Sequence, residues 1–250
     1  MKILKAFYRT SAKSNLQLTI KLDEIIIGSM LGDLTAEKRN KNSNTRLQGQ
    51  PPPEGVTSLL KIVFILIIYI HYFKNIVGRQ SLPIIMSKFD SRPNKMKDYT
   101  SIKFQTLPPS KEEGCLPCFN KYRELFYNSE GIKIVPNNLE SNPKGLTAKG
   151  LAYWIMDDGY KSNKGFYICT ESFNLSEHQL LINVLKNNFN LDSNVHQTTN
   201  GYRLYIFSTS KDKLIELIKP YLINHFYYKF ELENINPLRW RWQPPARGFD

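Results

Sequence analysis

The chain contains two apolar segments that each end in acidic residues, and each segment opens one copy of a repeated plan. The first segment, Glu24 to Leu31, is followed by Gly32-Asp33, and the second, Leu151 to Met156, is followed by Asp157-Asp158. Both segments are too hydrophobic for surface helices, so we expect them to be buried. A carboxylate in the last turn of a helix costs about 0.3–1 kcal/mol, because the helix dipole is already negative there. Two such placements at equivalent points of a repeat indicate a function at these residues.

The duplication predicts an α+β fold made of two pseudo-symmetric αββαββα repeats. In the second copy we expect a strand over 166–170, a helix that begins at a Ser176 cap, a strand over 202–207 and a helix over 211–222. The first copy shows a strand-like alternation over 99–106. Such a repeat gives two antiparallel sheets, each covered by helices on one face and free on the other.

The sequence divides into four parts. They are a basic N-terminal arm over 1–17, a first repeat over 18–143, a second repeat over 144–235 and a C-terminal tail over 236–250. Pro-rich insertions near 49–56 and 107–115 lengthen the first repeat. We expect both insertions to be exposed loops without regular structure, because proline removes a backbone donor and glycine adds conformational freedom.

The net charge narrows the class of partner. The chain has 34 Lys and Arg against 22 Asp and Glu, a formal charge of +12, which favours nucleic acid or an acidic membrane surface. The longest apolar stretch, Ile62 to Ile70, is shorter than the ~17–20 residues that span a bilayer. Nucleic acid is therefore the expected partner, and a membrane is not.

Small residues in both apolar segments allow the two predicted helices to approach closely. Gly28 lies in the first segment and Gly32 directly follows it, one turn further along, and Ala152 lies in the second segment. If the segments pack side by side, Asp33 and Asp158 meet at one end, where two ionised carboxylates repel each other. A divalent cation between them removes this repulsion, and hard oxygen ligands favour Mg²⁺ over zinc.

Both segments resemble the two signature helices of LAGLIDADG homing endonucleases. The second match, Leu151-Ala-Tyr-Trp-Ile-Met-Asp-Asp158-Gly159, keeps the Leu-Ala start, the acidic pair and the final glycine. The first, Ile26-Ile-Gly28-Ser-Met-Leu-Gly32-Asp33, keeps the central glycine and the last aspartate but has Leu34 in place of the final glycine. Further agreement lies in Lys133-Ile-Val-Pro-Asn-Asn138 and Ile218-Lys-Pro-Tyr-Leu222. These segments look like the single-chain, two-repeat branch of the family.

The resemblance implies a fold and a metal site. The paired signature helices would form the interface between the repeats, and saddle-shaped antiparallel sheets would bind DNA. Mg²⁺ would be bound by Asp33 and Asp158, together with the peptide carbonyls of Gly32 and Asp157.

The resemblance also implies further site residues. Lys133 and Lys229 would lie beside the cleavage site and balance the negative charge that develops there. DNA contacts are expected from basic and polar residues of the sheets, namely Lys38, Arg39, Lys41, Arg46, Lys161, Lys164, Arg203 and Tyr205.

These features lead to three functional hypotheses. The first is a monomeric, intron-encoded, Mg²⁺-dependent endonuclease that cuts double-stranded DNA at a long asymmetric site and leaves 3′ overhangs. The second is a maturase that binds its host intron RNA on the same scaffold. The third is an inactive relic, because the stretch over 62–70 is apolar all round where an amphipathic helix is expected, and a frame change within 49–86 would explain it. The resemblance favours a mitochondrial location, with the chloroplast as the alternative.

Overall fold

The computed structural model describes residues 18–38, 40, 43–49, 84–88, 99–105, 117–140, 145–162 and 164–232. The predictions for the basic arm, the Pro-rich insertions beyond Gly49, the apolar stretch 62–70 and the C-terminal tail lie outside these residues. Arg39 and Lys41, two of the expected DNA contacts, also lie outside them.

The first half begins with helix α2 (Ile20–Leu31), which leads into a four-stranded antiparallel sheet. Its strands are β1 (Leu34–Glu37), β2 (Arg46–Gly49), β3 (Ile84–Lys88) and β4 (Tyr99–Gln105), in the order β1-β2-β4-β3. A 3₁₀ turn (Pro117–Phe119) then opens helix α4 (Asn120–Phe126).

The second half has the predicted order of elements and the same strand order in its sheet. Its helices and strands are α5 (Ala148–Asp158), β5 (Gly159–Lys161), β6 (Phe166–Ile168), α6 (Leu175–Phe189), β7 (Ser193–Thr198), β8 (Gly201–Ile206) and α7 (Lys211–Ile218). The sheet order is β5-β6-β8-β7, antiparallel throughout. Short 3₁₀ helices follow at Ser208–Ser210, Lys219–Tyr221 and Asn224–Phe230. The prediction of an α+β fold with two antiparallel sheets is therefore confirmed.

Local chemistry explains where several helices begin and end. The hydroxyls of Thr19 and Thr147 accept the backbone N–H groups of Leu22 and Gly150, which caps α2 and α5. Helix α6 begins after Asn174, so the predicted Ser176 cap was wrong by two residues. Helix α7 ends at Ile218 and passes into a 3₁₀ turn that contains Pro220, since proline has no backbone N–H to continue an α-helix.

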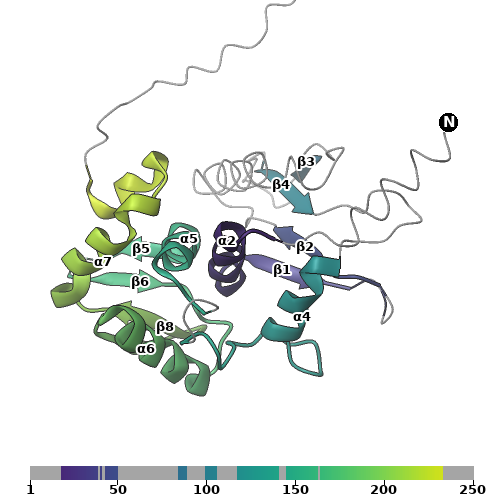
Figure 1. The fold of residues 1–250 in the computed structure, drawn as a ribbon. Coiled ribbons are helices and arrows are strands. Elements are labelled where there is room, and N and C mark those ends of the chain that lie inside the picture. Colours follow the sequence, from purple (N-terminus) through teal and green to yellow (C-terminus); the bar gives the residue numbers. More distant parts are fainter. Residues whose placement is uncertain are drawn as a thin grey trace, which may run out of the picture.

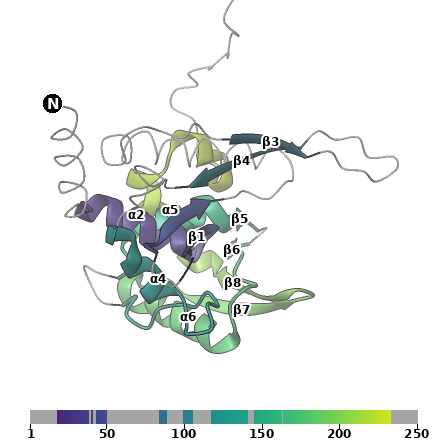
Figure 2. The same ribbon diagram turned by 90° about the vertical axis from the view of Figure 1, so that its right-hand side faces the viewer.

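The two signature helices lie at the centre of the molecule. Figure 1 shows α2 and α5 side by side, with α4 on one flank and α6 and α7 on the other. The hairpins β3–β4 and β7–β8 project in the same direction, beyond the C-terminal end of α2 (Figure 2). The buried core between helices and sheets includes Trp154, Phe119, Phe126 and Phe166. Among the described residues, no helix combines the length and apolar character needed to cross a membrane.

Candidate catalytic and metal site

The paired helices make their closest approach at two glycines. A Cβ placed on Gly28 would lie 1.9 Å from the carbonyl oxygen of Gly150, and a Cβ on Gly150 would lie 2.9 Å from the carbonyl oxygen of Glu24. Neither distance leaves room for a side chain, so α2 and α5 touch backbone to backbone here. The sequence correctly pointed to Gly28, but Gly150 makes the close contact in α5, two residues before the Ala152 that the sequence suggested.

This contact brings three carboxylates together at the C-terminal ends of the helices. One carboxylate oxygen from each of Asp33, Asp157 and Asp158 can be chosen so that all three lie within 4.8 Å of one another. Asp157 is buried, and its Oδ2 accepts the backbone N–H of Asp33 from the other repeat at 2.8 Å. The sequence assigned only the peptide carbonyl of Asp157 to the site, because nothing in the repeat shows where its side chain points.

Glycine at position 32 makes room for this cluster. A Cβ there would lie 2.4 Å from the Oδ2 of Asp157 and 2.9 Å from the Oδ2 of Asp158. Gly32 and Asp157 are equivalent positions of the repeat. The second half therefore has a carboxylate at the position where the first half has no side chain. The three converging ligand groups are hard oxygens with negative charge, a set that fits Mg²⁺, Mn²⁺ or Ca²⁺.

Two lysines hold the ends of the signature helices. The Nζ of Lys133 donates to the carbonyls of Gly32 (2.5 Å) and Leu34 (3.1 Å). The Nζ of Lys229, which is 8% exposed, donates to the carbonyls of Met156 (2.8 Å) and Gly159 (2.7 Å). Each ammonium thus satisfies carbonyls at the negative end of a helix. The structure therefore places both predicted lysines next to the aspartates.

Burial and the acidic cluster shift the pKa of Lys133 in opposite directions. Burial lowers the pKa of Lys133 from 10.5 to about 8, although the carboxylates of Asp158, Asp157 and Asp33 oppose this shift. The ammonium is therefore less stable in the folded protein than in water, even beside three acids.

We expect the metal-free protein to gain stability over its Lys133→Met variant as the pH rises from about 8 to 10.5. In this window the unfolded chain keeps the Lys133 proton and the folded chain loses it. Stability rises with pH wherever the unfolded state binds more protons, and methionine removes the titration. Urea unfolding in EDTA at several pH values measures the difference. Parallel pH profiles for the two proteins would contradict the lowered pKa.

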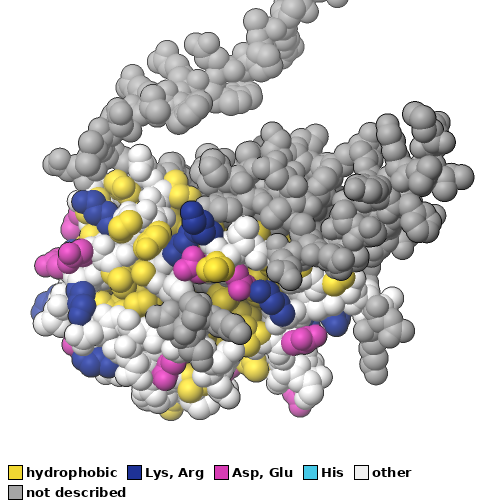
Figure 3. All heavy atoms as spheres, in the orientation of Figure 1, with side chains coloured by type: hydrophobic (Ala, Val, Ile, Leu, Met, Phe, Trp, Pro, Cys, Tyr) yellow, Lys and Arg dark blue, Asp and Glu magenta, His cyan; other side chains and the backbone are white. Residues whose placement is uncertain are grey.

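Several of the expected DNA-binding cations pair with carboxylates of their own half. The guanidinium of Arg46 lies 2.6 Å from the Oε2 of Glu37. Lys161 forms an ion pair with Glu231, and Arg203 forms one with Glu171. Lys38 and Lys164 are exposed. On the face drawn in Figure 3, basic and acidic side chains are likewise interspersed. To bind a DNA phosphate, each of these paired side chains would have to leave its carboxylate or bind the carboxylate and the phosphate together.

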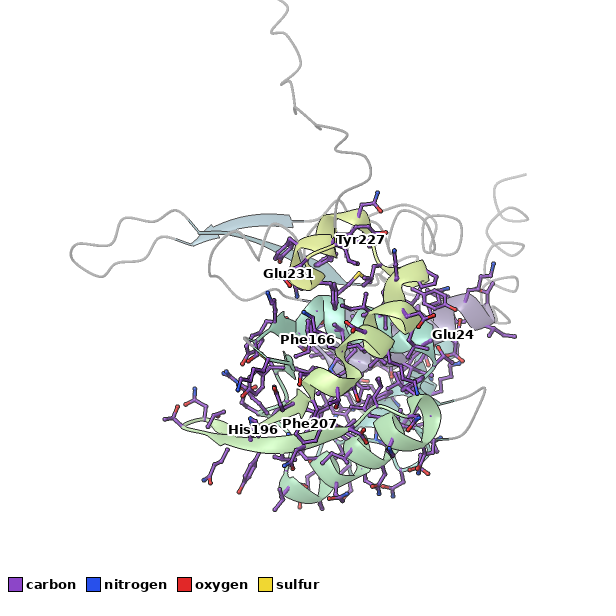
Figure 4. All side chains as sticks on the ribbon, turned by 90° about the vertical axis from the view of Figure 1, so that its left-hand side faces the viewer. Glu24, Phe166, His196, Phe207, Tyr227 and Glu231 are labelled. Carbon is purple, nitrogen blue, oxygen red and sulfur yellow. The ribbon has the colours of Figure 1, made fainter. Side chains whose placement is uncertain are left out.

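A row of aromatic rings crosses the face of the second sheet opposite its helices. Tyr160, Tyr167 and Tyr205 are paired across β5, β6 and β8, with ring centroids 5.4 Å and 4.7 Å apart. His196 stacks on Tyr205 at 4.6 Å, and its Nδ1 lies 2.8 Å from the Tyr167 hydroxyl. Figure 4 shows His196 on the projecting β7–β8 hairpin, on the opposite side of the molecule from Glu24 on α2.

An open groove of about 570 Å³ runs along this row, between Tyr160, Tyr167, His196 and Arg203. Sequence reasoning found Tyr205 and Arg203 from the alternation in β8. It missed His196 because β7 is polar except for Val195 and was not predicted as a strand. The turn at Asn200-Gly201, a typical hairpin signal, would have revealed β7.

Comparison with known proteins agrees with this geometry. The model of the LAGLIDADG DNA endonuclease family matches residues 23–214. The chain belongs to this family. The match covers most of both repeats, and the resemblance of the two LAGLIDADG segments is confirmed.

Relatives of this LAGLIDADG protein include both maturases and endonucleases. It is 30% identical over 219 residues to a cytochrome b mRNA maturase bI2 of Debaryomyces hansenii, covering 86% of this chain and 75% of that protein. It is 29% identical over 229 residues to DNA endonuclease I-ChuI of Chlamydomonas applanata, covering 86% and 96%. The structure of homing endonuclease I-WcaI bound to its DNA recognition sequence shares 24% identity, with a TM-score of 0.69 and 92% of each chain covered. The fold is therefore that of LAGLIDADG proteins.

Proposed function

We propose that this LAGLIDADG protein is an intron-encoded, site-specific endonuclease that uses Mg²⁺ to cut both strands of DNA and leaves 3′ overhangs. The observation that carries this proposal is the convergence of Asp33, Asp157 and Asp158 from two repeats. The cluster lies at the ends of the signature helices beyond which both hairpins project (Figure 2). Endonucleases among its relatives support the same reaction.

In this proposal Asp33 and Asp158 would hold the cation between the repeats. When bound, Mg²⁺ lowers the pKa of a water and stabilises the leaving oxygen. Lys133 and Lys229 hold their Nζ atoms at the helix ends, where a positive charge would offset the negative charge that develops on the phosphate. The peptide carbonyls of Gly32 and Asp157 would complete the ligand set, and the carbonyl of Gly32 also accepts a hydrogen bond from Lys133.

The aromatic row favours double-stranded DNA as the partner of the second sheet. Tyr160 stacks on Tyr167, His196 stacks on Tyr205, and Tyr205 is tilted against Tyr167, so the rings cover much of one another's faces and leave mainly their edges accessible. Edges and hydroxyls suit the edges of paired bases in a groove, whereas unpaired bases stack on exposed ring faces. Two sheets of different sequence on a single chain suit a long asymmetric site bound by a monomer.

The test is cleavage of the gene in which the reading frame lies, in its intronless form. Purified protein should cut this DNA once with Mg²⁺ and leave it intact with EDTA. The same gene with the intron in place should not be cut, because the intron divides the site. Failure to cut the intronless gene with Mg²⁺ or Mn²⁺ would refute the proposal and favour an inactive relic.

A second candidate function is that of a maturase that binds its host intron RNA. Its support is the 30% identity, over most of the chain, with cytochrome b mRNA maturase bI2. The same relative supports the proposal of a mitochondrial location. Splicing of the purified intron RNA should then require the protein but tolerate Asp33→Asn and Asp158→Asn, because binding needs no hydrolysis. Splicing that proceeds equally without the protein would exclude this function.

A further inference from the structure

Glu177 connects the two repeats through the segment that carries Lys133. It lies in the first turn of α6, where Asn174 Oδ1 accepts the N–H of Glu177 (2.9 Å) and Glu177 Oε2 accepts the N–H of Asn174 (2.7 Å). This reciprocal pair is a capping box, an ordinary way to begin a helix. It uses only one of the two carboxylate oxygens.

The other oxygen reaches into the first repeat. Glu177 Oε1 accepts the backbone N–H of Val135 at 3.0 Å, across 42 positions of sequence. Both residues are buried, with Glu177 8% exposed and Val135 3% exposed. A buried backbone N–H that loses its acceptor is costly, so this contact fixes the place of Val135 relative to α6.

Val135 stands two residues after Lys133, and the rest of the segment is held from the first repeat. Lys133 forms a β-bridge with Tyr127, and the N–H of Ile134 donates to Phe126 at 2.8 Å. The Lys133 side chain then spans from this segment to the carbonyls at the end of α2. Among these anchors of the backbone, Glu177 is the one that comes from the second repeat.

We propose that Glu177 is a positioning residue for Lys133, so that helix α6 of the second repeat sets the place of the lysine of the first. This inference rests on the proposed function in requiring that Lys133 takes part in cleavage. The second lysine is held differently, because the 3₁₀ helix that carries Lys229 is closed within its own half by the N–H of Glu231 donating to Tyr227. The contact of Glu177 with Val135 therefore couples the second repeat to the lysine of the first repeat.

The test compares Glu177→Ala with Asn174→Ala. Both variants weaken the cap of α6, but Asn174→Ala removes only a side-chain acceptor and leaves the Glu177 carboxylate with Val135. Amide hydrogen exchange over 131–136 should rise in Glu177→Ala and stay near wild type in Asn174→Ala. Glu177→Gln keeps one acceptor oxygen and should give an intermediate result.

Cleavage supplies the functional readout. The single-turnover rate on the intronless gene with Mg²⁺ should fall about 10- to 100-fold in Glu177→Ala, the range expected when a reacting group is misplaced by up to about 1 Å. The Kd for the same DNA in EDTA should change less than about threefold. In a Lys133→Met background, Glu177→Ala should add no further loss.

Unchanged amide exchange in Glu177→Ala, an equal loss of rate in Asn174→Ala, or additive losses with Lys133→Met would each overturn the proposal. If the wild type cleaves but Lys133→Met cleaves equally well, Lys133 has no role in cleavage, and the proposal that Glu177 positions it for catalysis is overturned. A wild type that does not cut refutes the proposed function instead, and amide exchange still shows whether Glu177 holds the lysine segment.

Discussion

Replacing Asp158 with Asn should abolish DNA cleavage while leaving DNA binding nearly unchanged, and Asp33→Asn should do the same. Asparagine keeps the size of the side chain but removes the charge that would hold Mg²⁺ within the cluster. A metal contributes several kcal/mol to the stabilisation of a transition state, and each 1.36 kcal/mol is a factor of ten in rate. The expected loss is therefore about 10³-fold or more in either variant.

Single-turnover cleavage of the intronless gene with Mg²⁺ measures this loss, and a filter-binding Kd in EDTA measures the binding. Asp192→Asn is a matched control, because Asp192 is an exposed carboxylate that pairs with Lys186 away from the cluster. It should cut at the wild-type rate. Cleavage by Asp158→Asn within tenfold of wild type would contradict the assigned role of the carboxylates.

Replacing Gly28 with Ala should destabilise the protein by about 3 kcal/mol or more and lower its melting temperature clearly. The new Cβ would meet the carbonyl oxygen, carbonyl carbon and Cα of Gly150 at 1.9, 2.6 and 2.8 Å. All three atoms are backbone, so no side chain can turn away and the two helices must separate. Overpacking a core costs about 1–3 kcal/mol or more, against a total stability of about 5–15 kcal/mol, and here the site lies in the contact that joins both halves.

Ser29→Ala supplies the control in the neighbouring position of the same helix. Its hydroxyl is buried and has no hydrogen-bond partner in the part of the chain that the structure describes, so removing it should leave the melting temperature unchanged or slightly higher. Thermal unfolding followed by circular dichroism measures both variants. A Gly28→Ala protein that melts within 2 °C of wild type, a margin of about 0.5 kcal/mol, would contradict the close helix contact.

The parts of the site that a repeat can reveal were predictable from the sequence. Asp33 and Asp158 stand out because a carboxylate is unfavourable at the C-terminus of a helix, and the repeat places one there in both copies. Aligning the two copies also matched Lys133 with Lys229. The fold class followed from the same duplication. Each of these conclusions depends on residues near one another in the chain or related by the repeat.

Other parts depend on contacts between the halves, which one sequence does not encode in any local pattern. The side chain of Asp157 reaches the backbone of Asp33 only because Gly32 leaves space for it. The contact of Glu177 with Val135 is equally invisible, since the capping box alone explains a glutamate at that position. The stacking of His196 on Tyr205 required the register of β7 and β8.

The exchange of a carboxylate for a glycine between equivalent positions 157 and 32 also limits how halves of such proteins can be recombined. A homodimer of the second half would set two buried Asp157 carboxylates against each other, where like charges repel. A homodimer of the first half would leave the backbone N–H of Asp33 without the acceptor that it has here. The two halves are thus complementary and not interchangeable, and a chimaera that grafts either half onto another scaffold must carry the glycine and the aspartate together.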